Sequence, residues 1–216
     1  MSAESGIATF RGSDGLWEQH RIEDAATPEA WEKNPALVQQ FYNQRRKGVL
    51  AAKPNAGHLQ IAQWQNDFDV TVVTQNIDDL HERAGSRNVL HLHGEIMKSR
   101  STSDSSLVYS IEGWELRMGD RCEKGSQLRP HIVWFGEEVP MLQTAADIIE
   151  GADLFIVVGT SLQVYPAAGL IHHAFNAKQK FVIDPSAHTL VNSEQWITLS
   201  KSAVEGLAEL NQLLLR

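Results

Sequence analysis

The chain of 216 residues is poor in cysteine, in long apolar runs and in basic residues, and each shortage excludes a class of protein. Its single cysteine, Cys122, excludes an internal disulfide and a four-thiolate zinc site, and it fits a reducing compartment. No apolar run approaches the roughly 20 residues of a membrane-spanning helix, and no basic and then apolar leader opens the chain. We therefore expect a soluble cytoplasmic protein with no membrane partner.

Acidic residues outnumber basic ones, 27 to 19, which gives a formal net charge of -8. A chain with this charge offers no dominant basic surface for a phosphate backbone, so we expect no nucleic-acid partner. The hydrophobic fraction of 42% and the length of the chain suit one globular domain with a sizeable core.

The apolar pattern predicts strands that alternate with helices. Nearly continuous runs with the composition of buried parallel strands cover residues 70–74, 154–158 and 180–183. Helical patterns, several with Pro or Asn near the start, cover residues 36–47, 55–66, 141–150, 166–177 and 203–215. This alternation predicts an α/β fold with a doubly wound parallel sheet. The segment 98–127 is rich in Ser, Asp and Gly and predicts a small lobe outside that sheet.

Polar residues follow the strand-like runs at the point where each run ends. Gln75 to Asp78 follow the first run, His93 follows a short apolar segment, and Gly159 to Ser161 follow the run 154–158. Because the carboxyl ends of parallel strands meet at one edge of a sheet, these residues should share a crevice. Asn76 offers amide donors and an acceptor, and Asp78 offers acceptors, a combination that suits a ring carboxamide.

Each of these residues also has a structural interpretation. Asp78 can be a helix N-cap, and Gly159 to Ser161 can form a plain strand-to-helix turn. His91 and His93 alternate on an extended segment, where either can be a metal ligand, a general base or a hydrogen-bonded packing residue. Residue types alone leave these alternatives open.

Tyr42 and Arg45 lie three residues apart on a predicted helix and therefore on one face of it. A guanidinium group beside a phenol hydroxyl is a good receptor for a carboxylate, although the spacing alone favours a solvated helix face.

Several sequence motifs occur together in this chain. They are residues 2–11 (SAESGIATFR), 15–17 (GLW), 74–81 (TQNIDDLH), 92–95 (LHGE), 128–137 (LRPHIVWFGE) and 159–161 (GTS). In this combination the chain resembles the sirtuin family from Ser2 to its C-terminal helix, and it is most similar to the bacterial class III type. The resemblance implies one catalytic domain over residues 1–216, with a Rossmann-like parallel sheet and the small lobe at about 98–127.

The resemblance implies an NAD-dependent protein-lysine deacylase that releases nicotinamide and O-acyl-ADP-ribose. It implies that His93 is the catalytic base that activates a ribose hydroxyl. The implied cofactor-binding residues are Ser2, Ala3, Phe10, Arg11, Trp17, Gln75, Asn76, Ile77, Asp78, Gly159, Thr160, Ser161 and Ala203.

The resemblance also implies a substrate, an acylated lysine in a protein, that adds as a strand along residues 133–137. Tyr42 and Arg45 match the pair that binds a succinyl or malonyl carboxylate, and Ala26 matches the small residue that leaves room for it. The implied substrate-binding residues are Ala26, Tyr42, Arg45, Val133, Phe135, Gly136 and Glu137. Desuccinylase and demalonylase activity beside deacetylase activity is therefore expected.

The chain departs from the family pattern in two internal places. Sirtuins commonly carry two Cys-x-x-Cys pairs for a structural zinc, whereas residues 98–127 contain Cys122 alone, so we expect no metal. The asparagine that contacts the adenine ribose is replaced by Val182, which predicts that this contact is lost.

The start of the chain departs from the pattern as well. Sirtuins begin with an apolar strand and Gly-Ala-Gly before the serine that matches Ser2, and here Met1 stands where that motif should end. Losing about five buried apolar residues would remove on the order of 10 kcal/mol. The resulting hypothesis is that Met1 is an internal methionine or that the gene is truncated. The chain as given is then expected to fold poorly or to bind NAD weakly. The alternative functions are protein ADP-ribosyl transfer and a non-catalytic module that binds acylated peptides.

Overall fold

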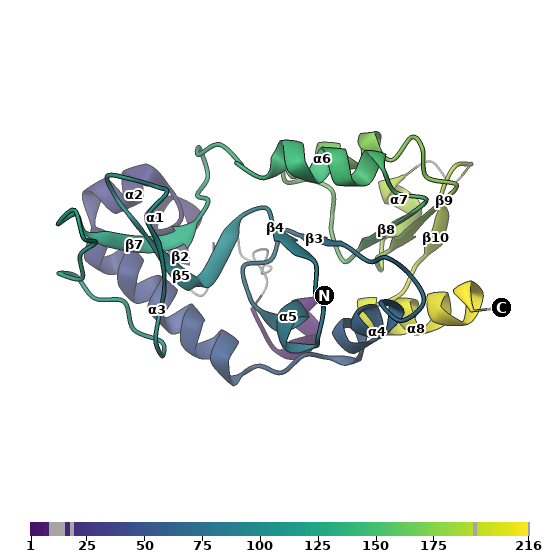
Figure 1. Ribbon diagram of the computed structural model, residues 1–216, viewed down its shortest axis with the longest axis horizontal. Helices are drawn as coiled ribbons and strands as arrows, with labels where there is room; N and C mark the ends of the chain where they lie inside the picture. Colours follow the sequence, from purple (N-terminus) through teal and green to yellow (C-terminus); the bar gives the residue numbers. More distant parts are fainter. Residues whose placement is uncertain (9–15, 18–19, 192–193, 216) are drawn as a thin grey trace.

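The computed structural model describes residues 1–8, 16–17, 20–191 and 194–215, and Figure 1 shows their arrangement. The elements in chain order are η1 (Ser2–Ser5), β1 (Leu16–Trp17), β2 (His20–Arg21), α1 (Ile22–Ala25), α2 (Pro28–Lys33), α3 (Pro35–Ala51), α4 (Ala56–Trp64), β3 (Val72–Thr74), α5 (Leu80–Arg83), β4 (Val89–His91), β5 (Gly94–Ser101), β6 (Val108–Ser110), β7 (Leu128–Ile132), α6 (Leu142–Glu150), β8 (Leu154–Val158), η2 (Ala167–His173), β9 (Gln179–Ile183), α7 (Ala187–Leu190), β10 (Ile197–Leu199) and α8 (Ala203–Leu214).

Parallel strands form the centre of the fold and one end of it. The pair β3-β4 lies in the middle of the molecule, and the sheet β10-β9-β8 lies near the C-terminus (Figure 1). The predicted strands over 70–74, 154–158 and 180–183 correspond to β3, β8 and β9. The predicted α/β fold is confirmed, and the described parallel strands form two sheets rather than one.

Helices cover both faces of these strands. On one face α6 and η2 pack against Val73 of β3, Leu90 of β4 and Phe155 of β8. On the other face α4 and α8 pack against β8, β9 and β10 through a core that includes Leu207 and Leu210, both fully buried. Four of the predicted helices are present as α3, α4, α6 and α8, whereas the segment 166–177 forms the 3-10 helix η2.

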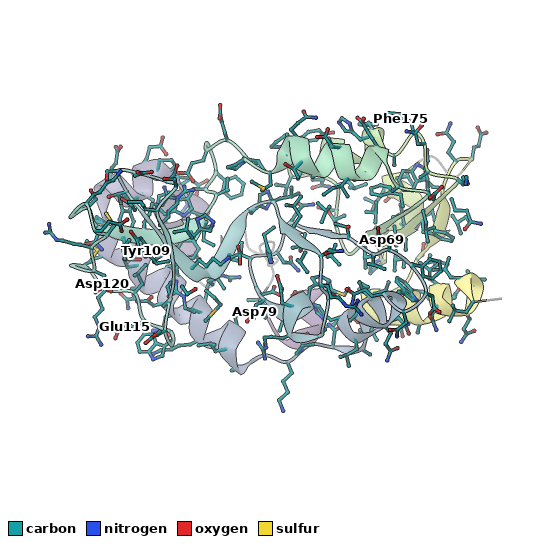
Figure 2. The ribbon with its side chains drawn as sticks, viewed as in Figure 1. Asp69, Asp79, Tyr109, Glu115, Asp120 and Phe175 are labelled. Atoms are coloured by element: carbon teal, nitrogen blue, oxygen red, sulfur yellow. The ribbon has the colours of Figure 1, made fainter. Side chains whose placement is uncertain are left out.

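A second lobe contains the antiparallel sheet β6-β5-β7, with α1, α2 and α3 packed beside it (Figure 1). The sequence pattern placed residues 98–127 alone in this lobe, but α3 contacts β5 and β7, so the lobe also includes the helices of residues 22–51. Figure 2 shows Tyr109, Glu115 and Asp120 in this lobe, far from Phe175 at the other end of the molecule. Its outer part packs around buried Leu116, Cys122 and Leu128.

Arg46 fixes α3 to the rest of this lobe. Its side chain is fully buried, and Nε donates to the carbonyl of Ile96 at 2.6 Å. Nη1 donates to Oδ1 of Asn43 at 2.7 Å and to the carbonyl of Trp114 at 2.8 Å. Burial lowers the pKa of Arg46 to about 10, but the group stays charged at neutral pH and its hydrogen bonds compensate for lost hydration.

Within the described part of the chain, none of the helices has the length and apolar character needed to cross a membrane.

We predict that Gly94→Ala destabilises the protein by about 3 kcal/mol or more. Gly94 has φ +81°, and a Cβ built there would lie 2.1 Å from the carbonyl oxygen of His131. Gly113→Ala is the matched control, because Gly113 has φ +73° but no neighbouring atom within 4 Å of such a Cβ. The control should cost about 1–2 kcal/mol, the backbone penalty alone. Chemical denaturation measures both values, and equal losses would contradict the steric argument.

Candidate active site

The pairing of β3 with β4 brings the two polar segments of the site together. The strands are parallel, with Thr74 opposite His91, and the N–H of Leu92 donates to the carbonyl of Thr74 at 2.9 Å. Beyond this point the N–H of Ile96 donates to the carbonyl of Ile77 at 2.8 Å. The loop after β3 and the segment after β4 therefore run side by side, as the sequence pattern predicts.

His93 is held in one tautomer by the neighbouring loop. Its Nδ1 lies 3.1 Å from the carbonyl oxygen of Gln75, and a carbonyl only accepts, so Nδ1 carries the hydrogen. Nε2 then has a lone pair available in the neutral ring. Burial lowers the pKa of His93, and the hydrogen bond to Gln75 opposes that effect only in part, so the ring is neutral at physiological pH. His93 lines the cavity and has the properties of a general base.

The loop after β3 presents an amide and a carboxylate. The side-chain amide of Asn76 donates to Oγ of Ser2 at 2.8 Å, and the backbone N–H of Asn76 donates to Oγ1 of Thr74 at 3.0 Å. Oδ1 of buried Asp78 accepts from the N–H of Leu80 at 3.2 Å. The N-cap of α5 is Asp79 rather than Asp78, and Asp78, beside this hydrogen bond, lines the cavity.

Of the alternatives that the sequence leaves open for His91, the structure agrees with the hydrogen-bonded packing residue. Its Nδ1 lies 3.0 Å from the carbonyl oxygen of Asn76, and its Nε2 lies 2.7 Å from Oε1 of Glu82. The alternation of His91 and His93 in the sequence was the signal that His91 belongs near the site. Its contact with Glu82 joins two separate elements and can be seen only in the folded chain.

The loop after β8 forms another wall of the cavity. Gly159 has φ +59°, and a Cβ built on it would lie 2.7 Å from the backbone nitrogen of Met1. Glycine therefore allows this close approach of two backbone segments. Thr160 and Ser161 follow, and Oγ1 of Thr160 accepts from the N–H of Leu162 at 3.2 Å. The turn interpretation and the ligand-wall interpretation are thus compatible.

The opposite end of the cavity carries Tyr42 and Arg45 of α3. Both residues are buried and line the cavity together with Ala26, which excludes the solvated-face interpretation. Burial raises the pKa of Tyr42, although its hydrogen bond with Trp134 and the charge of Arg45 oppose this effect, so the phenol is neutral. This end of the cavity can receive an acidic group.

The segment after β7 wraps around the carboxylate of Glu137. Arg129 donates to it at 2.6 and 3.1 Å, Arg100 donates at 3.1 Å to each oxygen, and the N–H of Trp134 donates at 2.8 Å. Burial raises the pKa of Glu137, but these hydrogen bonds and positive charges outweigh it and lower the pKa. The guanidinium of Arg129 also stacks over the ring of Trp134 at 3.2 Å. The side chain of Glu137 therefore stabilises this turn.

A cavity of about 1050 Å³ connects all these parts. It extends from Tyr42 past His93 to the space between β3 and β8. The residues implied by the resemblance that line it are Ser2, Ala3, Ala26, Tyr42, Arg45, Gln75, Asn76, Ile77, Asp78, His93, Val133, Phe135, Gly136, Glu137, Gly159, Thr160 and Ser161. Trp134 and Leu162 also line it, and the sequence pattern assigned neither a role.

The remaining implied site residues lie elsewhere. Phe10, Arg11 and the side chain of Trp17 lie outside the described residues. Ala203 is buried at the start of α8 and does not line the cavity, although Leu207, one turn further along this helix, does. Val182 of β9 is fully buried in a core cluster with Val157 and Ala187, and it does not line the cavity.

Known proteins share both the sequence and the fold. A sequence model described as the Sir2 family matches residues 1–166. An NAD-dependent protein deacylase of Bacteroides thetaiotaomicron is 50% identical over 220 residues, which covers 100% of this chain and 94% of that protein. An NAD-dependent protein deacylase of Helicobacter pylori is 48% identical, with 97% of this chain and 91% of that protein covered.

Solved structures agree with these relatives. A Sir2 homologue in complex with ADP-ribose has a TM-score of 0.88 and 40% identity, and the match covers 100% of this chain and 90% of that one. A Sir2 homologue in complex with NAD has a TM-score of 0.87 and 40% identity, covering 99% and 85%. The fold and its crevice define an α/β protein with a ligand site at the strand ends. The chain belongs to the Sir2 family, the sirtuins.

We predict that Glu137→Ala destabilises the protein by about 2–4 kcal/mol, because Arg129 and Arg100 lose the carboxylate that balances their charge. The side chains of these three residues are between 10% and 21% exposed. Glu115→Ala removes a solvent-exposed ion pair with Arg117 and should change stability little. Thermal and chemical unfolding measure the difference. Similar small effects from both substitutions would show that the ion pairs of Glu137 are not stabilising.

Proposed function

We propose that this sirtuin is an NAD-dependent protein-lysine deacylase that removes succinyl and malonyl groups as well as acetyl groups. The observation that carries the proposal is one continuous cavity that is lined by neutral His93, by Asn76 and Asp78 and by the buried guanidinium of Arg45. The substrates are acylated lysines in proteins. The similarity to named deacylases over nearly the whole chain supports the reaction class.

The residues of the cavity fit NAD by the chemistry of their donors and acceptors. Asn76 can exchange hydrogen bonds with a carboxamide, and Asp78 can accept from its amide. Gly159 permits close approach of the backbone, and the hydroxyls of Thr160 and Ser161 can meet ribose or phosphate oxygens. Ser2, Ala3, Gln75 and Ile77 complete the proposed cofactor set. When bound, NAD supplies a ribose that receives the acyl group, with nicotinamide as the leaving group.

His93 supplies the base for this reaction. Its Nδ1–H stays bound to the carbonyl of Gln75, so the Nε2 lone pair accepts a proton from a hydroxyl in the cavity. The neutral ring is the active form. Because burial lowers the pKa of His93, this form persists to lower pH than in an ordinary histidine.

The acyl group is proposed to extend toward α3. A succinyl or malonyl carboxylate can accept from the guanidinium of Arg45 and from the phenol of Tyr42, as charge-assisted hydrogen bonds. Ala26, which is 2% exposed, leaves room beside them because its side chain is a single methyl group. An acetyl group fits the same space but gains no ionic contact.

The peptide is proposed to bind along residues 133–137. The N–H of Val133 donates to the carbonyl of His93 at 2.9 Å, and the N–H of Phe135 donates to that of Ala26 at 3.0 Å. These contacts join the proposed peptide edge to the base and to the acyl pocket. Phe135, Gly136 and Glu137 line the same edge, and Gly136 has φ +90°. Because the N–H groups of Val133, Trp134 and Phe135 are already bonded, an extended peptide would donate its own N–H groups to backbone carbonyls of this edge.

We predict that Arg45→Met lowers kcat/KM for succinyl-lysine peptides by on the order of 100-fold while changing the value for acetyl-lysine peptides much less. The reason is that only the acidic acyl group leaves a carboxylate without its cation in the variant. Gln44→Met is the matched control, because Gln44 is the exposed neighbour on α3. Equal losses on both substrates would remove Arg45 from the specificity role.

We predict that His93→Gln abolishes the removal of every acyl group and leaves NAD binding and the unfolding temperature near wild type. In the wild type, kcat should fall as pH drops through the lowered pKa of His93, because protonation removes the base. Release of O-acyl-ADP-ribose, followed by mass spectrometry, measures the reaction. Labelled ADP-ribose attached to protein instead would favour the transferase alternative, and substantial activity of the variant would exclude His93 as the base.

A further inference from the structure

His91 bridges two acceptors that belong to different elements. Its Nδ1 lies 3.0 Å from the carbonyl oxygen of Asn76 in the loop 75–78, which is called the cofactor loop below. Its Nε2 lies 2.7 Å from a carboxylate oxygen of Glu82 on α5. The side chain of His91 is 7% exposed, whereas that of Glu82 is 40% exposed. Water therefore reaches the carboxylate but scarcely reaches the imidazole.

Both ring nitrogens of His91 must be donors in this arrangement. A carbonyl oxygen and a carboxylate oxygen only accept hydrogen bonds, so each nitrogen needs a hydrogen, and the ring that has both hydrogens is the imidazolium. His93 makes only the carbonyl contact of this kind, to Gln75, and is neutral. His93 and His91 thus contact the consecutive carbonyls of Gln75 and Asn76, with His93 neutral and His91 positively charged.

The groups around His91 agree with this assignment. Burial alone lowers its pKa, but the hydrogen bonds to Glu82 and Asn76, with the charges of Glu82 and of Glu95 on β5, outweigh burial and raise it. His81 on α5 is the neighbouring base, and burial lowers its pKa so that it is neutral and adds little repulsion. Asp78 faces His81 from the cofactor loop.

We propose that His91 is a positioning residue for the cofactor loop. As a charged bridge between Glu82 and the carbonyl of Asn76, it fixes this loop and with it the side chain of Asn76, which is proposed to bind the carboxamide of NAD. Loss of the proton from His91 loosens the loop and weakens NAD binding. The inference rests on the proposed function for the identity of the ligand. It adds a residue that does not touch the ligand but acts through Asn76.

The sign of the pH effect follows from the charge of the bridge. Below the pKa of His91 the ring donates to both acceptors, and the loop is fixed. As pH rises through that pKa, a lone pair on Nε2 faces the carboxylate of Glu82 and the bridge fails. NAD affinity should therefore fall at alkaline pH, whereas the base at His93 becomes available as pH rises from the acid side. Dissociation constants and kcat should consequently respond to different histidines.

Nuclear magnetic resonance of the ligand-free protein tests the bridge directly. We expect the ring of His91 to titrate above the ordinary pH range of histidine, with the backbone amides of Asn76 and Ile77 following the same midpoint. Glu82→Gln should move that midpoint to lower pH, because it removes the charge but keeps a hydrogen-bonding side chain. Glu95→Gln is the matched control and should move it less, since Glu95 contributes charge without a hydrogen bond to His91.

Calorimetric NAD binding across the same pH range tests the consequence. His91→Asn keeps a donor for the carbonyl of Asn76, so it should bind NAD with little pH dependence. His91→Leu removes the donor and should bind about tenfold more weakly at neutral pH. Thermal unfolding identifies any variant that fails to fold, and Glu82→Gln then provides the same test with the histidine intact.

The results separate this inference from the proposed function. A His91 ring that is neutral at pH 6, or loop amides that ignore its midpoint, would overturn the positioning role. Unchanged NAD affinity in both His91→Leu and Glu82→Gln at every pH would overturn it as well. A wild-type protein that binds NAD as expected but removes no acyl group would refute the proposed function and leave the positioning role of His91 intact.

Discussion

The parallel pairing of β3 with β4 is the constraint on which the site depends. It places the carbonyls of Gln75 and Asn76 beside the rings of His93 and His91, and it directs the chain into β5 at Gly94, where the backbone adopts a positive φ against His131. The carbonyl of His93 also accepts from the N–H of Val133, which joins these strands to the segment after β7. The loop 75–78, His93 and the segment after β7 are therefore joined by the hydrogen bonds around this one pair of strands.

This arrangement shows how similar local geometry yields different chemistry. His91 and His93 each point one nitrogen at a backbone carbonyl, which fixes the ring. The second nitrogen decides the charge. At His91 it meets the carboxylate of Glu82, while at His93 it faces a cavity in which burial favours the neutral form. The carboxylate of Glu82 on α5 is thus the feature that distinguishes the surroundings of His91 from those of His93.

Sequence alone predicted the parts of the site that depend on local pattern. The continuous apolar run at 154–158 gave β8, and polar residues at strand ends gave the loop 75–78 and His93. The motifs of the family identified the distant pair Tyr42 and Arg45. What pattern could not provide were contacts between segments far apart in the chain. Arg46, for example, meets the carbonyl of Trp114, 68 positions away, which places α3 in the lobe that composition restricted to residues 98–127.

The burial of Arg46 also has a mechanical consequence for its neighbour. Successive residues on a helix point about 100° apart, so Arg45 reaches the cavity while Arg46 anchors the same turn of α3 to β5 and to the segment near Trp114. A shift of this part of α3 that moved Arg45 would therefore require the buried hydrogen bonds of Arg46 to break. Under the proposed function, the preference for acidic acyl groups would then depend on how firmly α3 is held as well as on the charge of Arg45.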